Sequence, residues 1–328
     1  MKERFSEHPR RLLSFAPYIF GGVVLLIFPL FASSYVMSLM TQILIFAILA
    51  SSLDLLMGYT GLPSFGHATF LGTAAYTTGL LVNYGIENPV LTAAGGILMS
   101  GLVALPFGFL AVRTAGPYFL MITLALGQLL FAVAWNWRSV TGGDDGLPGI
   151  SRPKLGIPWS LTDPTHFYFF VLLVFVICFF LMRRIVNSPF GHTLTGIHEN
   201  EHRMRALGYN TFAYKYVCFI LSGLFGGVAG VLYAYFNGFV SPLELSIGSS
   251  GEIMLMVILG GPGTLFGPAL GAGVIVLMKH FVSIYTEYWM WIIGLAFVLT
   301  ILYLPRGIGG YLLQFWKKRV IGYGSPEG

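Results

Sequence analysis

The sequence predicts an all-α integral membrane protein that crosses the bilayer about eight to ten times. Of the 328 residues, 56% are hydrophobic and 9% are charged, whereas a soluble domain carries about 25% charged residues. The apolar residues gather in runs of about twenty, the length that a helix needs to cross a hydrocarbon core about 30 Å thick. This composition excludes a water-soluble enzyme, a disordered chain and a nucleic-acid-binding module.

Eight apolar runs have the length and composition of membrane-spanning helices. The first follows several basic residues and is too long for the apolar core of a signal peptide, so we expect it to be retained and to enter from the cytoplasm. A further apolar segment, 252–278, is predicted to enter and return on one side, because eight spans already place both ends together; two short spans are the alternative. The eight predicted spans are 17–36, 38–57, 61–82, 89–112, 117–137, 166–184, 213–236 and 287–304.

The basic residues orient the chain, because Lys and Arg in short loops mark the cytoplasmic side of a membrane. Arg113 follows the fourth span, Arg183 and Arg184 follow the sixth, and a basic cluster at 317–319 follows the last and is expected near anionic lipid. The predicted organisation is a cytoplasmic segment 1–16, a membrane domain 17–304 with a cytoplasmic loop 183–212 and an external, periplasmic loop 138–165, and a cytoplasmic tail 305–328.

Two apolar segments are interrupted by glycine and proline: GYTGLPSFGHATFLG at 58–72 and LGGPGTLFGPALGAG at 259–273. Offset by 201 positions, as from Phe65 to Phe266, they match at four residues, which indicates two related halves. Irregular backbone is tolerated inside a bilayer only where protein or water covers it. Such a pair of broken segments points to a transport pathway. Close packing of helices through small residues is the alternative.

The candidate pathway residues lie in these breaks and in the helical turn before the first one. A buried carboxylate needs a partner, so Asp54 is predicted either to gate the pathway or to bond the amides of the turn at Gly58–Gly61. His67 is either a proton relay or a hydrogen-bonded structural residue, and Glu252 is expected to cap a helix. Free amides in the breaks could hold a solute carboxylate. The candidates are Asp54, Gly58, Gly61, Ser64, Gly66, His67, Gly260, Gly261, Gly263 and Gly267.

The cytoplasmic loop contains the segment GIHENEHRMRALGYN. Glu199 with Arg203, and Glu201 with Arg205, are acid-first pairs four residues apart, which stabilise a helix. Gly208 is a good helix stop. The pattern predicts a short, charged, amphipathic helix beneath the membrane, with a merely solvated connector as the alternative.

The segments GYTGLPSFGHATFLGTAAY, TGGDDGLPGI, ENEHRMRALGYNTFAYK, ILGGPGTLFGPALGA and LPRGI, taken in that order, resemble the LivM-type membrane permeases of branched-chain amino acid ABC importers. The resemblance covers roughly residues 38 to 308. It implies a bacterial inner-membrane complex with a second permease subunit, two ATP-binding subunits and a periplasmic solute-binding protein. It also implies that the loop helix couples to an ATPase through Glu199, Asn200, Arg203, Arg205, Ala206, Leu207 and Gly208.

The chain itself is predicted to be no enzyme and to bind no cofactor. It lacks the GxxxxGK[ST] loop that cradles nucleotide phosphates, so ATP and Mg are expected on the partner ATPase subunits. Pro63, Phe65, Asp144 and Asp145 depart from the family pattern, which leaves the solute open among branched-chain amino acids, other amino acids, small carboxylates and urea.

Two other classes of function compete with the importer. A self-sufficient channel or secondary transporter would use Asp54, His67 or Glu252 for ion coupling, although such carriers usually need a relay of buried charges. A membrane-embedded enzyme would need a clustered catalytic or metal-binding set. His198 and His202 lie four residues apart with no evident third ligand, and we expect them to be surface residues.

Overall fold

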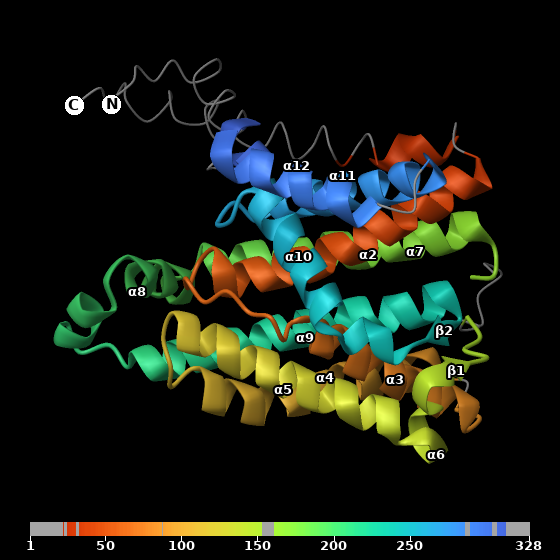
Figure 1. The fold of residues 1–328 in the computed structure, drawn as a ribbon, viewed down its shortest axis with the longest axis horizontal. Coiled ribbons are helices and arrows are strands. Elements are labelled where there is room, and N and C mark those ends of the chain that lie inside the picture. The colour runs from red at the N-terminus through yellow and green to blue at the C-terminus, as the bar shows by residue number, and fades with distance from the viewer. Residues whose placement is uncertain are drawn as a thin grey trace, which may run out of the picture.

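The computed structural model describes residues 22, 25–30, 33–86, 88–152, 161–285, 289–303 and 307–312. Over these residues the chain is a bundle of helices (Figure 1). Within these described residues, six helices are long and apolar enough to cross a membrane: α2 (Ser34–Met57), α4 (Pro89–Ala111), α5 (Pro117–Asn136), α7 (Pro164–Val186), α9 (Thr211–Asn237) and α11 (Phe266–Tyr285).

The remaining elements are shorter. Two short strands, β1 (Leu147–Pro148) and β2 (Phe239–Val240), pair antiparallel, with Leu147 opposite Val240. The other elements are η1 (Phe28–Leu30), α3 (Ala68–Asn83), α6 (Arg138–Thr141), η2 (Gly143–Asp145), α8 (Pro189–Ala206), η3 (Pro242–Leu245), α10 (Ile247–Gly260) and α12 (Trp289–Tyr303).

Helix starts follow from short sequence signals. The Asn88 side chain accepts hydrogen bonds from the amides of Val90 and Leu91 at the start of α4, and Asp163 accepts one from the amide of Thr165 at the start of α7. In both helices the next residue is a proline. At the first position of a helix the missing N–H of proline costs no hydrogen bond, and its ring fixes φ near the helical value. These signals place the helix starts at residues 89 and 164.

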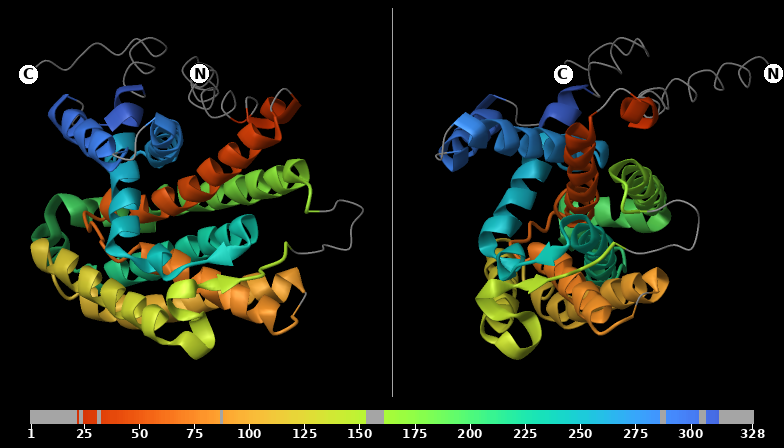
Figure 2. Two further views of the ribbon diagram at one scale, coloured as in Figure 1. Left: turned by 45° about the vertical axis from the view of Figure 1, so that its right-hand side comes forward. Right: turned by 90° about the vertical axis from the view of Figure 1, so that its right-hand side faces the viewer.

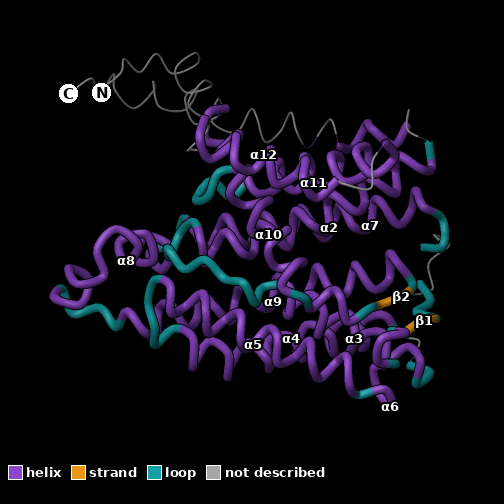
Figure 3. The backbone as a smooth tube through the Cα atoms, viewed as in Figure 1, coloured by secondary structure: helices purple, strands orange, loops and turns teal. Residues whose placement is uncertain are grey.

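Most helices run along the long axis of the molecule, and the two ends of the bundle differ. Helix α8 lies at one end, whereas β1, β2 and α6 lie at the opposite end (Figures 1 and 3). Helix α10 runs steeply across the others and links α11 to the segment after α9 (Figure 2). The bundle therefore has one end built around a polar helix and one end closed by short elements.

Small residues bring α3 and α4 against α9 at the centre. A Cβ added at Gly230 would lie 2.2 Å from the Leu71 carbonyl oxygen, and one at Gly223 would lie 2.7 Å from the Ala104 Cβ. Such close contacts are how membrane helices pack when water provides no hydrophobic driving force between them. Outward faces carry exposed apolar side chains, as at Leu98 and Phe180, each 63% exposed. The chain is a multi-pass membrane protein.

The predicted spans 89–112, 117–137, 166–184 and 213–236 correspond to single long helices, α4, α5, α7 and α9. The prediction for 61–82 is partly wrong: residues 61–67 are loop, and α3 has 16 residues, fewer than a full crossing needs. The boundary between the first two spans also shifts, because α2 begins at Ser34. The segment 1–16, most of 17–36 and the tail beyond 312 lie outside the described residues.

The route predicted for 252–278, either entry and return on one side or two short spans, stays a prediction. The chain forms α10, with 14 residues, and α11, with 20, separated by a turn, and α11 is long enough to cross alone. The turn exists because Gly261, Gly263 and Leu265 have positive φ values of 104°, 77° and 58°. The glycines and proline of the sequence indicate that the apolar segment is broken, but they do not indicate the path of the chain after the break.

Candidate functional site

The two glycine breaks meet, and Asp54 joins them. Asp54 lies in the last turn of α2 and is fully buried. Its Oδ1 accepts a hydrogen bond from the Gly263 amide at 2.7 Å, and its Oδ2 accepts one from the Leu265 amide at 3.0 Å. These amides precede α11, where backbone donors have no partner within the helix. We call Asp54, residues 58–67 and residues 261–265 the junction.

The sequence prediction for Asp54 was right about the kind of partner and wrong about which turn supplies it. The amides belong to the second break, 209 and 211 positions away, and not to the turn at Gly58–Gly61. Because Asp54 already occupies the amides of Gly263 and Leu265, those two donors do not hold a solute carboxylate in this structure.

Gly58 permits the close approach of the two breaks. A Cβ there would lie 2.1 Å from the Gly263 nitrogen and 2.2 Å from Asp54 Oδ1. Leu265 adopts a left-handed conformation that is costly for a side chain with a Cβ. Its amide bonds Asp54, and its carbonyl oxygen accepts a hydrogen bond from Ser51 Oγ at 3.2 Å. Helix α2 therefore holds the second break on both sides of Leu265.

Helix α8 contacts the junction through His198. Its Nδ1 lies 3.1 Å from the carbonyl oxygen of Gly58, and since a carbonyl only accepts, Nδ1 carries the hydrogen. The same ring packs on Gly61, where an added Cβ would lie 2.6 Å from His198 Cδ2. Sequence reasoning missed this contact, because the partner is 140 positions away and the pattern within α8 gives no sign of it.

Helix α8 is not the single continuous helix that was predicted. Asn200 is extended, with φ −158° and ψ 95°, and its side chain accepts a hydrogen bond from the Arg203 amide at 2.9 Å. Asn200 thus begins a second short helix. Glu199 lies before the kink and Arg203 after it, so the predicted spacing of that pair along one helix does not apply.

The second predicted pair is present and belongs to a larger network. Glu201 accepts hydrogen bonds from Arg205 at 2.6 Å, from Lys215 at 2.5 Å and from the Thr211 hydroxyl at 3.0 Å. Burial alone would raise the pKa of Glu201, but the hydrogen bonds from Lys215 and Arg205 outweigh it and leave the pKa below its ordinary value. Because Lys215 is buried in the first turns of α9, this network fixes α8 to α9.

The residues predicted to couple to an ATPase all lie exposed around the kink and the end of α8. Leu207 among them is 66% exposed. Gly208, with φ 90°, follows the helix end as the sequence indicated. Their role in coupling stays a prediction.

The predicted pathway residues in the breaks are packed by neighbouring helices. A Cβ at Gly66 would lie 2.4 Å from the Thr123 carbonyl oxygen of α5, and one at Gly260 would lie 2.1 Å from the Gly267 carbonyl oxygen. Ser64 and His67 are also buried. These contacts support the close-packing interpretation, and the role of these residues in a pathway stays a prediction.

His67 is a hydrogen-bonded residue inside the bundle. Its Nε2 lies 2.8 Å from Ser52 Oγ, which itself donates to the Leu49 carbonyl at 2.7 Å. Since the Ser52 proton is used there, His67 Nε2 is the donor to Ser52. The Nδ1 of His67 is buried and has no partner among the described residues.

Glu252 does not cap a helix, contrary to expectation. Helix α10 begins at Ile247, with Ser246 Oγ accepting a hydrogen bond from the Ser249 amide. Glu252 lies further along and pairs with Lys279 of α11 at 3.0 Å. Ser246 supplies the cap, so the Glu252 carboxylate is available for a partner on another helix.

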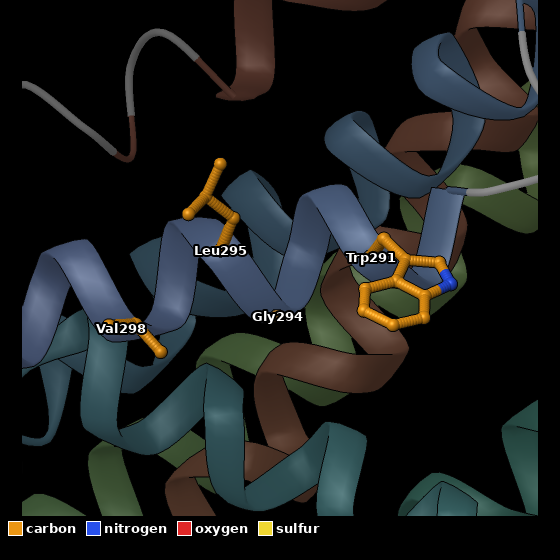
Figure 4. Close-up of a pocket in the computed structure, with 4 residues that line it drawn as sticks. All are labelled: Trp291, Gly294, Leu295 and Val298. Carbon is orange, nitrogen blue, oxygen red and sulfur yellow. The ribbon is translucent and has the colours of Figure 1, made fainter.

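A shallow apolar pocket lies apart from the junction, on α12 (Figure 4). The side chains that line it are hydrocarbon apart from the ring nitrogen of Trp291. Such a surface suits lipid or another apolar helix and offers no charge to a polar solute. Its lining residues are Trp291, Gly294, Leu295 and Val298.

The long apolar helices, the buried junction of two broken segments and the polar helix at one end define a membrane permease. The family model described as "Branched-chain amino acid transport system / permease component" matches residues 35–301, and the chain belongs to this family.

Individual relatives agree with the family. The chain is 28% identical over 309 residues to the high-affinity branched-chain amino acid permease LivM of Salmonella typhimurium, covering 87% of this chain and 72% of the relative. It is 23% identical to the probable LivM of Methanocaldococcus jannaschii, covering 83% and 89%. It is 22% identical to the LivH permease of Escherichia coli, covering 81% and 91%. No solved structure gives a significant match.

Proposed function

We propose that this chain is a permease subunit of an ABC importer that carries branched-chain amino acids, or a similar small amphipathic solute, into the cell. Family membership and the printed functions of LivM and LivH support it. In the complex, a second permease completes the pathway, two ATPase subunits bind ATP and Mg, and a soluble binding protein delivers solute. The chain lies in the inner membrane with both termini in the cytoplasm.

The observation that carries the proposal is the contact between α8 and the junction. His198 donates to the Gly58 carbonyl, Gly58 packs on Gly263, and Asp54 binds the Gly263 amide. A helix displayed at one end of the bundle is thereby linked to both broken segments. Displacement of α8 by an ATPase would move the first break directly and the second break through its packing.

The network at Glu201 holds the second part of α8 on α9 during that displacement. Glu201 ties the second part of α8 to Lys215 of α9, while the exposed side chains around the kink remain available to a partner. Arginine is among the residues that are enriched at protein interfaces. The chain thus combines a docking surface with a mechanical link to the membrane interior.

The test is to co-express the chain with the ATPase and permease genes beside it, purify it in mild detergent and identify the copurifying subunits. We expect an ATPase and a second permease, and we expect the variant Glu199→Ala/Arg203→Ala/Arg205→Ala to lose the ATPase. The matched control is Asp144→Ala/Asp145→Ala, exposed at the opposite end, which should retain it. Solute uptake by the chain alone in liposomes, without an ATPase, would instead establish a self-sufficient transporter.

A further inference from the structure

A second polar cluster lies apart from the junction, where five elements meet. Glu244 of η3 accepts a hydrogen bond from the Tyr233 hydroxyl of α9 at 2.5 Å. Glu252 of α10 accepts hydrogen bonds from Lys279 of α11 at 3.0 and 3.2 Å. Electrostatic interactions link Glu244 with Lys279, with Glu252 and with Tyr76 of α3. The cluster therefore combines residues from both halves of the chain.

Among the residues that the structure describes, the charges of this cluster do not balance. Two carboxylates face one ammonium group, and that ammonium group forms its ion pair with Glu252. The hydrogen bond that Glu244 receives from Tyr233 comes from a neutral hydroxyl. A carboxylate enclosed in a membrane protein is costly without a positive partner. One additional cation would make the cluster neutral.

Tyr76 provides a second, independent indication of a binding site in this cluster. Its side chain is 6% exposed, and its hydroxyl has no hydrogen-bond partner among the described residues. Buried hydroxyls are almost always hydrogen-bonded, because an unmade bond is costly. One turn earlier in α3, Gly72 packs on Leu245 of η3, where an added Cβ would lie 2.4 Å from Leu245 Cγ. This packing places α3 against η3, and Tyr76 interacts electrostatically with Glu244 across that contact.

We propose that Glu244 and Tyr76 bind the ammonium group of the transported solute. The Glu244 carboxylate supplies the counter-charge and the Tyr76 hydroxyl oxygen accepts a hydrogen bond from the ammonium group. Tyr233 holds Glu244 in place. This inference rests on the proposed import function and narrows its substrate class to solutes with an amine, such as zwitterionic amino acids, in preference to urea or simple carboxylates.

If the cluster had a purely structural role, substitutions in it would have different effects. The bond between Tyr233 and Glu244 would hold η3 against α9 without a negative charge and without the Tyr76 hydroxyl. Glu244→Gln keeps an oxygen that can accept from Tyr233 and removes only the charge. Tyr76→Phe removes a hydroxyl that bonds no described residue, so it should leave stability unchanged or higher. Both variants therefore separate binding from folding.

The test uses the complete importer, with its second permease and ATPases, in two measurements. Equilibrium binding of radiolabelled L-leucine to the purified complex, without the soluble binding protein, gives the affinity of the permease itself. ATP-driven uptake into liposomes with saturating binding protein compares L-leucine with 4-methylpentanoate, which lacks the amine, and with urea. The control is Tyr168→Phe, which removes a buried hydroxyl that donates to the Leu25 carbonyl at 2.8 Å, outside the cluster.

We expect Glu244→Gln and Tyr76→Phe each to raise the Kd for L-leucine at least about tenfold, as loss of a hydrogen bond to a charged group does. Their thermal unfolding midpoints should equal or exceed that of the wild type, and Tyr168→Phe should keep the wild-type Kd. Unchanged Kd values for both variants, or wild-type uptake of urea or 4-methylpentanoate at the rate of L-leucine, would overturn the inference while leaving the import function standing. Absence of ATP-driven uptake by the wild-type complex would overturn both.

Discussion

The Asp54 carboxylate accepts a 2.7 Å hydrogen bond from the backbone amide of Gly263, so the end of α2 is bonded to the turn between α10 and α11. The same turn packs on Gly58, whose carbonyl is bonded to His198 of α8. Three segments far apart in sequence thus meet at one buried point. A satisfied buried polar contact is costly to break and makes the segments that it joins rigid, so we expect these three segments to move together.

Replacing Asp54 with Asn should destabilise the protein and slow transport. An asparagine side chain has one oxygen, so it can accept from only one of the two amides, and its own amide would face a second donor. We expect a loss of about 2 kcal/mol of stability, in the range for a hydrogen bond to a charged group. Thermal unfolding in detergent measures it.

The control for that prediction is Asp163→Asn. Asp163 accepts a hydrogen bond from the Thr165 amide at an exposed helix start, where Asn and Asp are equally good caps. Its unfolding midpoint should stay within about 1 °C of the wild type, since no net cap energy is lost. An equal loss of stability in both variants would contradict the inference that Asp54 stabilises the protein by joining α2 to the second break.

Gly58→Ala should destabilise the junction by about 1–3 kcal/mol, the usual cost of overpacking. The added methyl group would meet the Gly263 nitrogen at 2.1 Å, and backbone cannot move aside cheaply. Gly251→Ala is the matched control, because a Cβ there meets nothing within 4 Å and alanine favours the helix. Comparable unfolding midpoints for the two variants would contradict the close approach described here.

His198→Ala should uncouple ATP hydrolysis from transport. The complex should still assemble and hydrolyse ATP, because the exposed docking residues are unchanged, but solute uptake per ATP should fall about tenfold, as expected for loss of one specific hydrogen bond with its packing. His198→Asn places an amide donor near the Nδ1 position and should restore part of the coupling. His202→Ala, exposed on the same helix, is the control. If uptake per ATP is equal in all variants, His198 has no role in coupling.

The hydrogen bonds of Glu201 predict how the stability of the protein depends on pH. Its pKa is depressed in the folded protein, so its bonds to Lys215 and Arg205 contribute stability that is present above the unfolded pKa and is lost as the pH falls through the folded value. Glu201→Gln should therefore destabilise the protein at pH 7 and approach the wild type below its ordinary pKa of about 4.5. Glu199→Gln, exposed just before the kink and outside the Glu201 network, is the matched control. A gap between Glu201→Gln and wild type that stays constant from pH 7 to pH 3 would contradict this.

The sequence predicts most of the long helices, because twenty apolar residues have few other structures available in a bilayer. It also identifies both broken segments and the polar loop helix. It does not reveal that Asp54 bonds the second break, since hydrogen-bond partners 209 positions apart leave no local pattern. The kink at Asn200 was missed for a related reason: the charges around it fit a continuous helix, and the break depends on a side chain capping the Arg203 amide.

The polar cluster around Glu244 was also not predicted. Tyr76, Tyr233 and Glu244 stand in three different, largely apolar segments. Tyrosines in membrane helices are usually interpreted as interfacial. The hydrogen bond from Tyr233 to Glu244 and the packing of η3 against α3 bring these segments together only in the folded chain. Glu252 was noticed in the sequence, but its position after four small residues suggested a cap and concealed its pairing with Lys279.

The central claim is that α8 acts on the membrane interior through His198, Gly58, Gly263 and Asp54 as one linkage. The most direct measurement is a double-mutant cycle on uptake per ATP, using His198→Ala, Asp54→Asn and the two together in the complete importer. If the residues act in one linkage, the double variant should transport as well as the worse single variant. If the losses of the two single variants multiply in the double variant, the residues act independently and the claim is wrong.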